Sequence, residues 1–130
     1  MYAAQSLPGP LEVSAAAPMP EGSRTALLVI DMQNDFVEAG APRQVSGATE
    51  IVPQVASAAE RMRMQGDLIV WVCRAYSDDG SNVEAARKPQ FLKNPYAVAG
   101  TRGAALVDGL DPWPDDLSVV TPSYSAFFRT

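Results

Sequence analysis

Residues 26–31 read ALLVID and residues 67–73 read DLIVWVC. Both are short apolar runs without polar alternation, which is typical of strands buried on both faces of a parallel sheet. Between them, residues 49–65 carry apolar side chains at steps of three or four, which predicts a helix with one apolar stripe facing the sheet. The apolar residues are Ile51, Val52, Val55, Ala59 and Met62, and we expect Ile51, Val55, Ala59 and Met62 to pack on the sheet. Strand, helix and strand at this spacing predict a βαβ unit with parallel strands and a right-handed crossover.

The strands of the predicted sheet are expected at roughly 26–31, 68–73 and 117–120, with the second between the other two. Residues 74–116 are less regular, and we predict short helices in SNVEAARK (81–88) and TRGAALVDG (101–109). The fold class is therefore α/β, a doubly wound parallel sheet of the Rossmann-like, three-layer α/β/α type. These residues supply about three strands, the first half of such a sheet.

The first predicted strand is the most hydrophobic and should sit centrally, yet no later strand in the sequence can flank its free side. An exposed parallel edge of this composition promotes aggregation, so we expect the 130-residue chain to be only marginally soluble. We expect residues 25–130 to be a truncated domain that stops within a helix starting at Ala126. Residues 1–24, rich in Pro and Ala, are expected to form a flexible arm.

The composition excludes several classes of function. A formal net charge of −5 and a pI near 4.5 argue against nucleic-acid or anionic-membrane partners. Histidine is absent, which removes the commonest metal ligand and the usual general base, so we expect no metal and no cofactor. One cysteine, Cys73, allows no internal disulfide. With neither a secretory signal nor an apolar run of about 20 residues, the expected location is cytoplasmic.

Asp31 ends the first predicted strand, and ligands of open parallel sheets bind at the carboxyl ends of strands. A turn-forming aspartate is the alternative interpretation. Phosphatases with an aspartate nucleophile need a second aspartate two residues later, where this chain has Gln33. No Gly-x-Gly-x-x-Gly follows either apolar strand, so dinucleotide binding is also excluded.

Four stretches together resemble the isochorismatase-like cysteine hydrolases. They are TALLVIDMQNDF (25–36), DDGSNVEAAR (78–87), AGTRGAALVDGLDPWPDD (99–116) and VVTPSYSAFFRT (119–130). They occur in the family's order over residues 24–130. The amidohydrolase branches, including ureidoacrylate, biuret and N-carbamoylsarcosine hydrolases, look closer than the nicotinamidases, which usually carry a metal site containing histidine.

The resemblance implies a six-stranded parallel sheet and an Asp-Lys-Cys triad that hydrolyses a small amide or ureido C–N bond through a thioester. The family's aspartate matches Asp31, the general-base position. The family's lysine stands three residues before the aromatic of its YSAF motif, and this chain has Thr121 there, by substitution or by deletion. Lys88 and Lys93 lie in the long loop and are poor substitutes.

The resemblance also places the family's cysteine after the fourth strand, outside these 130 residues. Cys73 lies within the second strand, where we expect a small core residue. Phe36 and Tyr124 are weaker candidates for the walls of a substrate pocket. We expect a chain that is inactive alone and a homo-oligomer once completed. The alternatives are a non-catalytic module that associates with an intact homologue, and a split enzyme whose cysteine and lysine come from a partner.

Overall fold

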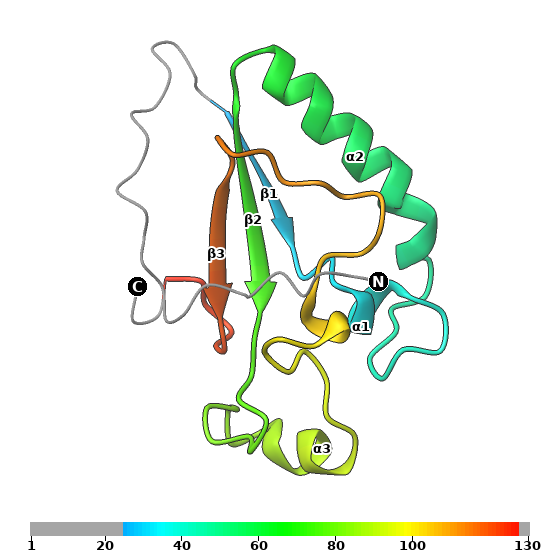
Figure 1. The fold of residues 1–130 in the computed structure, drawn as a ribbon, viewed down its shortest axis with the longest axis vertical. Helices are drawn as coiled ribbons and strands as arrows, with labels where there is room; N and C mark the ends of the chain where they lie inside the picture. The colour runs from blue at the N-terminus through cyan, green and yellow to red at the C-terminus, as the bar shows by residue number, and fades with distance from the viewer. Residues whose placement is uncertain (1–24, 128–130) are drawn as a thin grey trace.

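The computed structural model describes residues 25–127; the predicted arm over 1–24 and residues 128–130 lie outside this range. In order, the elements are β1 (Ala26–Ile30), α1 (Asn34–Val37), α2 (Ala48–Met64), β2 (Leu68–Arg74), α3 (Lys88–Lys93), the 3-10 turn η1 (Arg102–Ala104) and β3 (Leu117–Thr121). Figure 1 shows α2 beside the sheet and α3 beyond its carboxyl edge.

The sheet has the order β1-β2-β3, and both pairings are parallel. Val29 is in register with Trp71, and Arg74 with Thr121. The predicted βαβ unit, the parallel strands and the central second strand are therefore confirmed. Because all three strands point the same way, the residues that follow Ile30, Arg74 and Thr121 meet at one edge of the sheet (Figure 1).

Helix α2 covers one face of the sheet and is bounded by glycines in the left-handed region. Gly47 precedes it with φ +80°, and Gly66 closes it with φ +77° while its N–H donates to Arg63 O at 3.0 Å. The α2 residues that belong to the core or pack against it are Ala48, Val52, Val55, Ala56, Ala59 and Met62. Steps of four and three along one helix face produce this stripe.

The predicted stripe is wrong at its first member. Ile51 is 48% exposed, whereas Val52 is 9% exposed and packs in the core. Val52 lies on the same helix face as the buried Ala48 and Ala59, and Ile51 lies about 100° around the helix from it. Ile51 lines an open pocket next to Asp31 instead.

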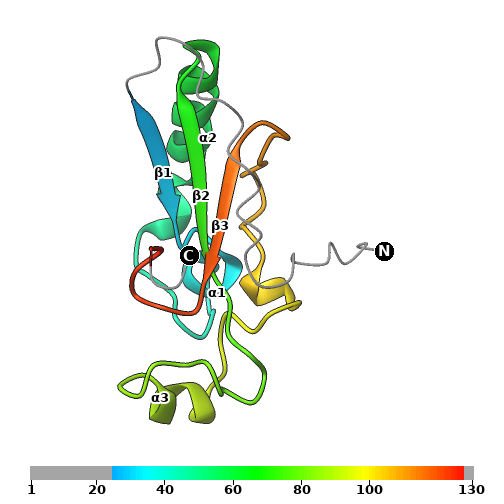
Figure 2. The same cartoon turned by 90° about the vertical axis from the view of Figure 1, so that its left-hand side faces the viewer.

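The two faces of the sheet differ in the described part of the chain. On the α2 face, Ile69 and Trp71 are each 1% exposed. On the other face no helix lies among residues 25–127 (Figure 2), and Leu28 and Ile30 are 51% and 56% exposed. The prediction that the first strand is buried on both faces is therefore wrong for these residues, because no second layer covers them.

The segment from 75 to 116 builds a second small core beyond the carboxyl edge. Its centre is a set of edge-to-face aromatic pairs among Tyr76, Phe91 and Tyr96, with ring centroids 5.4–5.8 Å apart. All three rings are at most 3% exposed. This aromatic cluster fixes the long segment against the end of β2.

Neither short helix predicted in this segment is present as expected. Residues 81–87 form turns, because Asp79 and Asn82 side chains accept backbone N–H groups of Ser81 and Ser77 at 2.8 and 2.7 Å. The helix α3 starts only at Lys88. In 101–109 only η1 is helical, because Val107 N–H donates to Met32 O at 3.0 Å instead.

At the opposite edge of the sheet, Asp116 joins α2 to β2 just before β3 begins. Its carboxylate accepts hydrogen bonds from Arg63, from Trp71 Nε1 at 2.8 Å and from Trp113 N at 2.9 Å. The side chain of Asp116 is 4% exposed. This buried ion pair fixes the start of β3 at the edge far from Asp31.

Candidate active site

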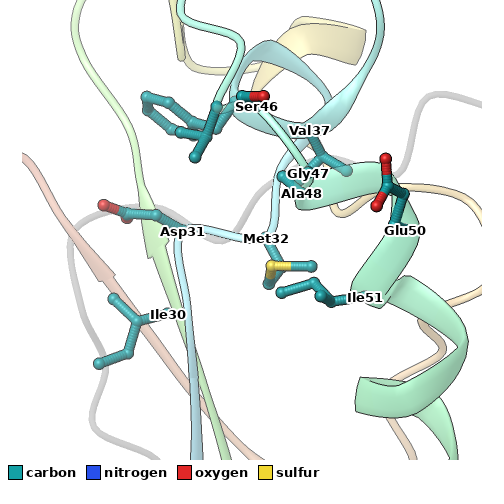
Figure 3. Close-up of a pocket in the computed structure, with 11 residues that line it drawn as sticks. Ile30, Asp31, Met32, Val37, Ser46, Gly47, Ala48, Glu50 and Ile51 are labelled. Carbon is teal, nitrogen blue, oxygen red and sulfur yellow. The ribbon is translucent and has the colours of Figure 1, made fainter.

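Asp31 follows β1 directly and has an unusual backbone. Its φ is +56°, in the left-handed region that residues other than glycine rarely adopt. The turn is fixed because Asp31 N–H donates to Val72 O at 2.9 Å and Asp31 O accepts from Gln33 N at 2.8 Å. Figure 3 shows the Asp31 carboxylate pointing away from Met32 and Ile51. The side chain is 32% exposed, so the carboxylate is open to a ligand.

Arg74 ends β2, the strand between Asp31 and Thr121. The residue is 6% exposed, and its Nη2 lies 3.3 Å from Asp31 Oδ2. Its Nη1 donates to Tyr76 Oη at 3.0 Å and lies 3.7 Å from Glu84 Oε1. Burial disfavours the charged guanidinium, but the Tyr76 hydrogen bond and the Asp31 charge leave the pKa of Arg74 above its ordinary value. Arg74 is thus a buried cation in contact with Asp31.

Thr121 ends β3 and is 3% exposed. Its Oγ1 accepts from Ser123 N at 3.0 Å and donates to Ser125 O at 3.3 Å, so the hydroxyl closes its own turn. Asp31 and Thr121 lie at the same edge and line one pocket, as predicted, with β2 between their strands.

Two open pockets share Asp31. One lies between β1 and the start of α2 and includes Phe36; the other lies on the bare sheet face and includes Tyr124. Phe36 also packs edge-on against Tyr96, with centroids 5.9 Å apart. Tyr124 is 63% exposed, and the Arg87 guanidinium lies 4.2 Å from its ring centroid. Both predicted wall residues therefore line pockets, although different ones.

Cys73 lies in β2 but lines neither pocket. Side chains alternate along a strand, so its thiol lies on the opposite face of the sheet from the neighbouring Arg74. Burial, together with the charge of Asp31, raises the pKa of the Cys73 thiol to about 12. At neutral pH it is therefore a protonated thiol, not a nucleophilic thiolate.

Gln33 builds the site, although in the sequence its position only excludes one enzyme class. Its side chain is fully buried; Nε2 donates to Arg74 O at 2.7 Å and to Ala104 O at 2.6 Å. Its Oε1 accepts from Arg74 N at 2.7 Å. The amide thus continues the hydrogen-bond ladder beyond the end of β2 and fixes Arg74 and η1. The motif DMQNDF contains this glutamine, but nothing in the motif indicates which backbone groups it bonds.

Among residues 25–127, no group of three or more acidic or cysteine side chains is arranged to hold a metal ion. In the same range, no helix has the length and apolar character needed to cross a lipid bilayer.

Residues 25–130 match the family model described as the Isochorismatase domain. This chain belongs to the isochorismatase family. The match covers both β1 with Asp31 and β3 with Thr121, so the site lies wholly within the family domain. The predicted family and its α/β fold class are confirmed.

Two curated members of the isochorismatase family are similar to this chain. A probable inactive nicotinamidase of Arabidopsis thaliana is 46% identical over an alignment of 109 positions, which covers 82% of this chain and 56% of the relative. The ureidoacrylate amidohydrolase RutB of an Enterobacter species is 29% identical over a gapped alignment of 144 positions, which covers 96% of this chain and 61% of RutB. The chain thus spans little more than half the length of these relatives.

Solved structures support the same fold. An isochorismatase family protein from Desulfovibrio vulgaris superposes with a TM-score of 0.74 at 43% identity. The match covers 80% of this chain and 55% of that protein.

Proposed function

We propose that this isochorismatase-family chain carries the general-base part of a cysteine-hydrolase site that cleaves a small amide or ureido C–N bond. The observation that carries the proposal is the position of Asp31. Its carboxylate lies at the carboxyl edge of the sheet, partly exposed, between two open pockets and beside a buried cation. This is the place where open α/β sheets bind ligands.

In the proposed reaction, the Asp31 carboxylate accepts the proton of a cysteine thiol, and the thiolate sulfur attacks the carbonyl carbon of the substrate. The C–N bond breaks, its electron pair stays on nitrogen, and the proton returns to that nitrogen as the amine or ammonia departs. Asp31 then takes a proton from water, and the water oxygen attacks the thioester carbon. The C–S bond breaks with its electron pair on sulfur, which takes the proton back from Asp31 and becomes the thiol again.

The 130 residues contain one thiol, and it does not fit this role. Cys73 is on the wrong face of the sheet, and the pKa of its thiol is raised to about 12. Thr121 offers only a neutral hydroxyl where the resemblance places a lysine. The reacting thiol therefore has to come from residues beyond these 130 or from a second chain. By itself this chain is proposed to be inactive.

An assay of ammonia release tests both the proposed inactivity of the chain alone and the proposed general-base role of Asp31. We expect no release above buffer when the 130-residue chain is incubated with nicotinamide, ureidoacrylate and N-carbamoyl amino acids. When the chain is fused to the cysteine-containing C-terminal half of a family member, release should appear and should be abolished by Asp31→Asn. Turnover by the unfused chain that survives Cys73→Ser but not Asp31→Asn would contradict the thioester route.

A non-catalytic module that associates with an intact homologue is the second candidate. The bare sheet face, with Leu28, Ile30 and Phe127 at 51%, 56% and 86% exposure, favours it. Exposed apolar area of this kind marks interaction surfaces. Size-exclusion chromatography with light scattering, on the chain mixed with an intact family member, tests this candidate. A stable complex would support it, and separate elution of the two proteins would exclude it.

A further inference from the structure

We propose that Arg74 is the positioning residue for Asp31, supplying from the end of β2 the positive charge that the family's lysine would supply from the end of β3. The inference rests on the proposed role of Asp31 as general base. It assigns a function to a side chain that neither the family motifs nor the strand pattern singled out.

The sheet register places Arg74 where it can replace a lysine at position 121. Arg74 and Thr121 are direct partners on neighbouring parallel strands, and both line the pocket on the bare face of the sheet. Arg74 belongs to the strand adjacent to β1, and its Nη2 already reaches Asp31 Oδ2 at 3.3 Å. A cationic side chain on β2 therefore does not have to be longer than one on β3 to reach Asp31.

The surroundings of Arg74 indicate that its positive charge, and not only its volume, matters for its contact with Asp31. Its side chain is 7% exposed, and its Nε is buried without a hydrogen-bond partner. Leaving such a donor unpaired costs about 1–3 kcal/mol, and a buried charge costs more. Gln33 bonds both the N–H and the C=O of Arg74, which fixes the backbone that carries this charge.

Arginine and lysine would not act identically here. A guanidinium keeps its proton at all accessible pH values, so Arg74 can stabilise the Asp31 carboxylate but cannot donate a proton to it. Its Nη1 also faces Tyr76 and Glu84. The rival explanation is therefore that Arg74 only neutralises Glu84 and packs against Tyr76. The experiment has to distinguish the effect of Asp31 on Arg74 from the effect of Glu84.

Urea unfolding of the 130-residue chain, in a cycle of R74M and T121K, tests whether the two cations share one role. With Arg74 present, T121K adds a second positive charge and should lower the urea midpoint. In the R74M background, T121K should raise the midpoint, because the lysine now supplies the missing charge. That gain should disappear when D31N is added. A shift of the same sign and size in both backgrounds would overturn the proposal.

A second measurement keeps Arg74 in place, in case R74M does not fold. The exchange of the Arg74 guanidinium protons is followed by nitrogen-15 NMR in wild type, D31N and E84Q. We expect D31N to accelerate this exchange severalfold and more than E84Q does. Acceleration by E84Q alone would assign Arg74 to Glu84 and overturn the proposal. Neither experiment requires turnover, so failure of the Arg74 proposal is distinguishable from failure of the proposed hydrolase function.

Discussion

Replacing Gln33 by methionine tests the hydrogen-bond clamp at the end of β2. Methionine is of similar length and fills the same buried space, but it neither donates nor accepts a strong hydrogen bond. The change removes three bonds of 2.6–2.7 Å and leaves Arg74 N, Arg74 O and Ala104 O without this partner. All three bonds lie in a fully buried position.

The expected loss of unfolding free energy follows from these three backbone groups. Each buried backbone group left unpaired costs about 1–3 kcal/mol, so three of them cost roughly 3–9 kcal/mol in a rigid structure. Ala104 lies in a short 3-10 turn that can shift towards water, which lowers the cost. We therefore expect the free energy of unfolding to fall by about 3–5 kcal/mol, a large part of the ~5–15 kcal/mol typical of a domain.

Urea denaturation followed by circular dichroism measures this loss from the midpoint at an unchanged slope. The matched control is Gln44→Met, which removes one exposed bond, from Gly40 N to Gln44 Oε1 at 2.9 Å. It should cost under about 1 kcal/mol. If Gln33→Met also cost less than about 1 kcal/mol, the argument that this amide holds β2 and η1 together would be refuted.

Two further outcomes are expected from the buried titratable groups. Burial alone would raise the pKa of the Asp116 carboxyl, but hydrogen bonds from Arg63 and Trp71 hold it below the ordinary 3.8. Asp116→Asn should therefore cost about 2 kcal/mol in unfolding free energy. This difference should be fully present above pH 3.8 and vanish as the pH falls through the lowered value; a pH-independent difference would contradict the ion-pair account. Because the pKa of the Cys73 thiol is raised to about 12, iodoacetamide at pH 8 should modify Cys73 only after unfolding, as mass spectrometry would show. Rapid modification of the folded chain would contradict the burial of the Cys73 thiol.

The fold could be predicted because it depends on local patterns. Two apolar runs and a helix of the right period between them specify a parallel βαβ unit, and the structure has it. The errors arose where side chains compete with the local pattern. Residues 81–88 have helical composition, but the Asp79 and Asn82 side chains accept the backbone N–H groups of Ser81 and Ser77. These bonds form turns where a helix was predicted. Ile51 and Val52 are both apolar neighbours, and the sequence pattern does not show which of the two faces the sheet.

The site could be predicted only in part. Topology predicts that Asp31 lies at the ligand edge, whereas its proposed general-base role comes from the family resemblance. Gln33 and Arg74 were not predicted as site residues, because their roles depend on contacts between residues 41 positions apart. A lone glutamine after a strand, or an arginine ending one, carries no local signal of the partner it will meet. That pairing exists only once β1 and β2 lie side by side.

The left-handed backbone at Asp31 also bears on which replacements this position would tolerate. With φ at +56°, glycine and asparagine would fit the turn at least as well as aspartate, whereas alanine or a branched residue would add strain of about 1 kcal/mol or more. The turn geometry alone therefore does not explain a carboxylate here. Asparagine would keep this turn but would leave the buried Arg74 cation without the Asp31 charge that lies 3.3 Å away. The carboxylate is therefore explained by its charge, which pairs with Arg74, and not by the shape of the turn.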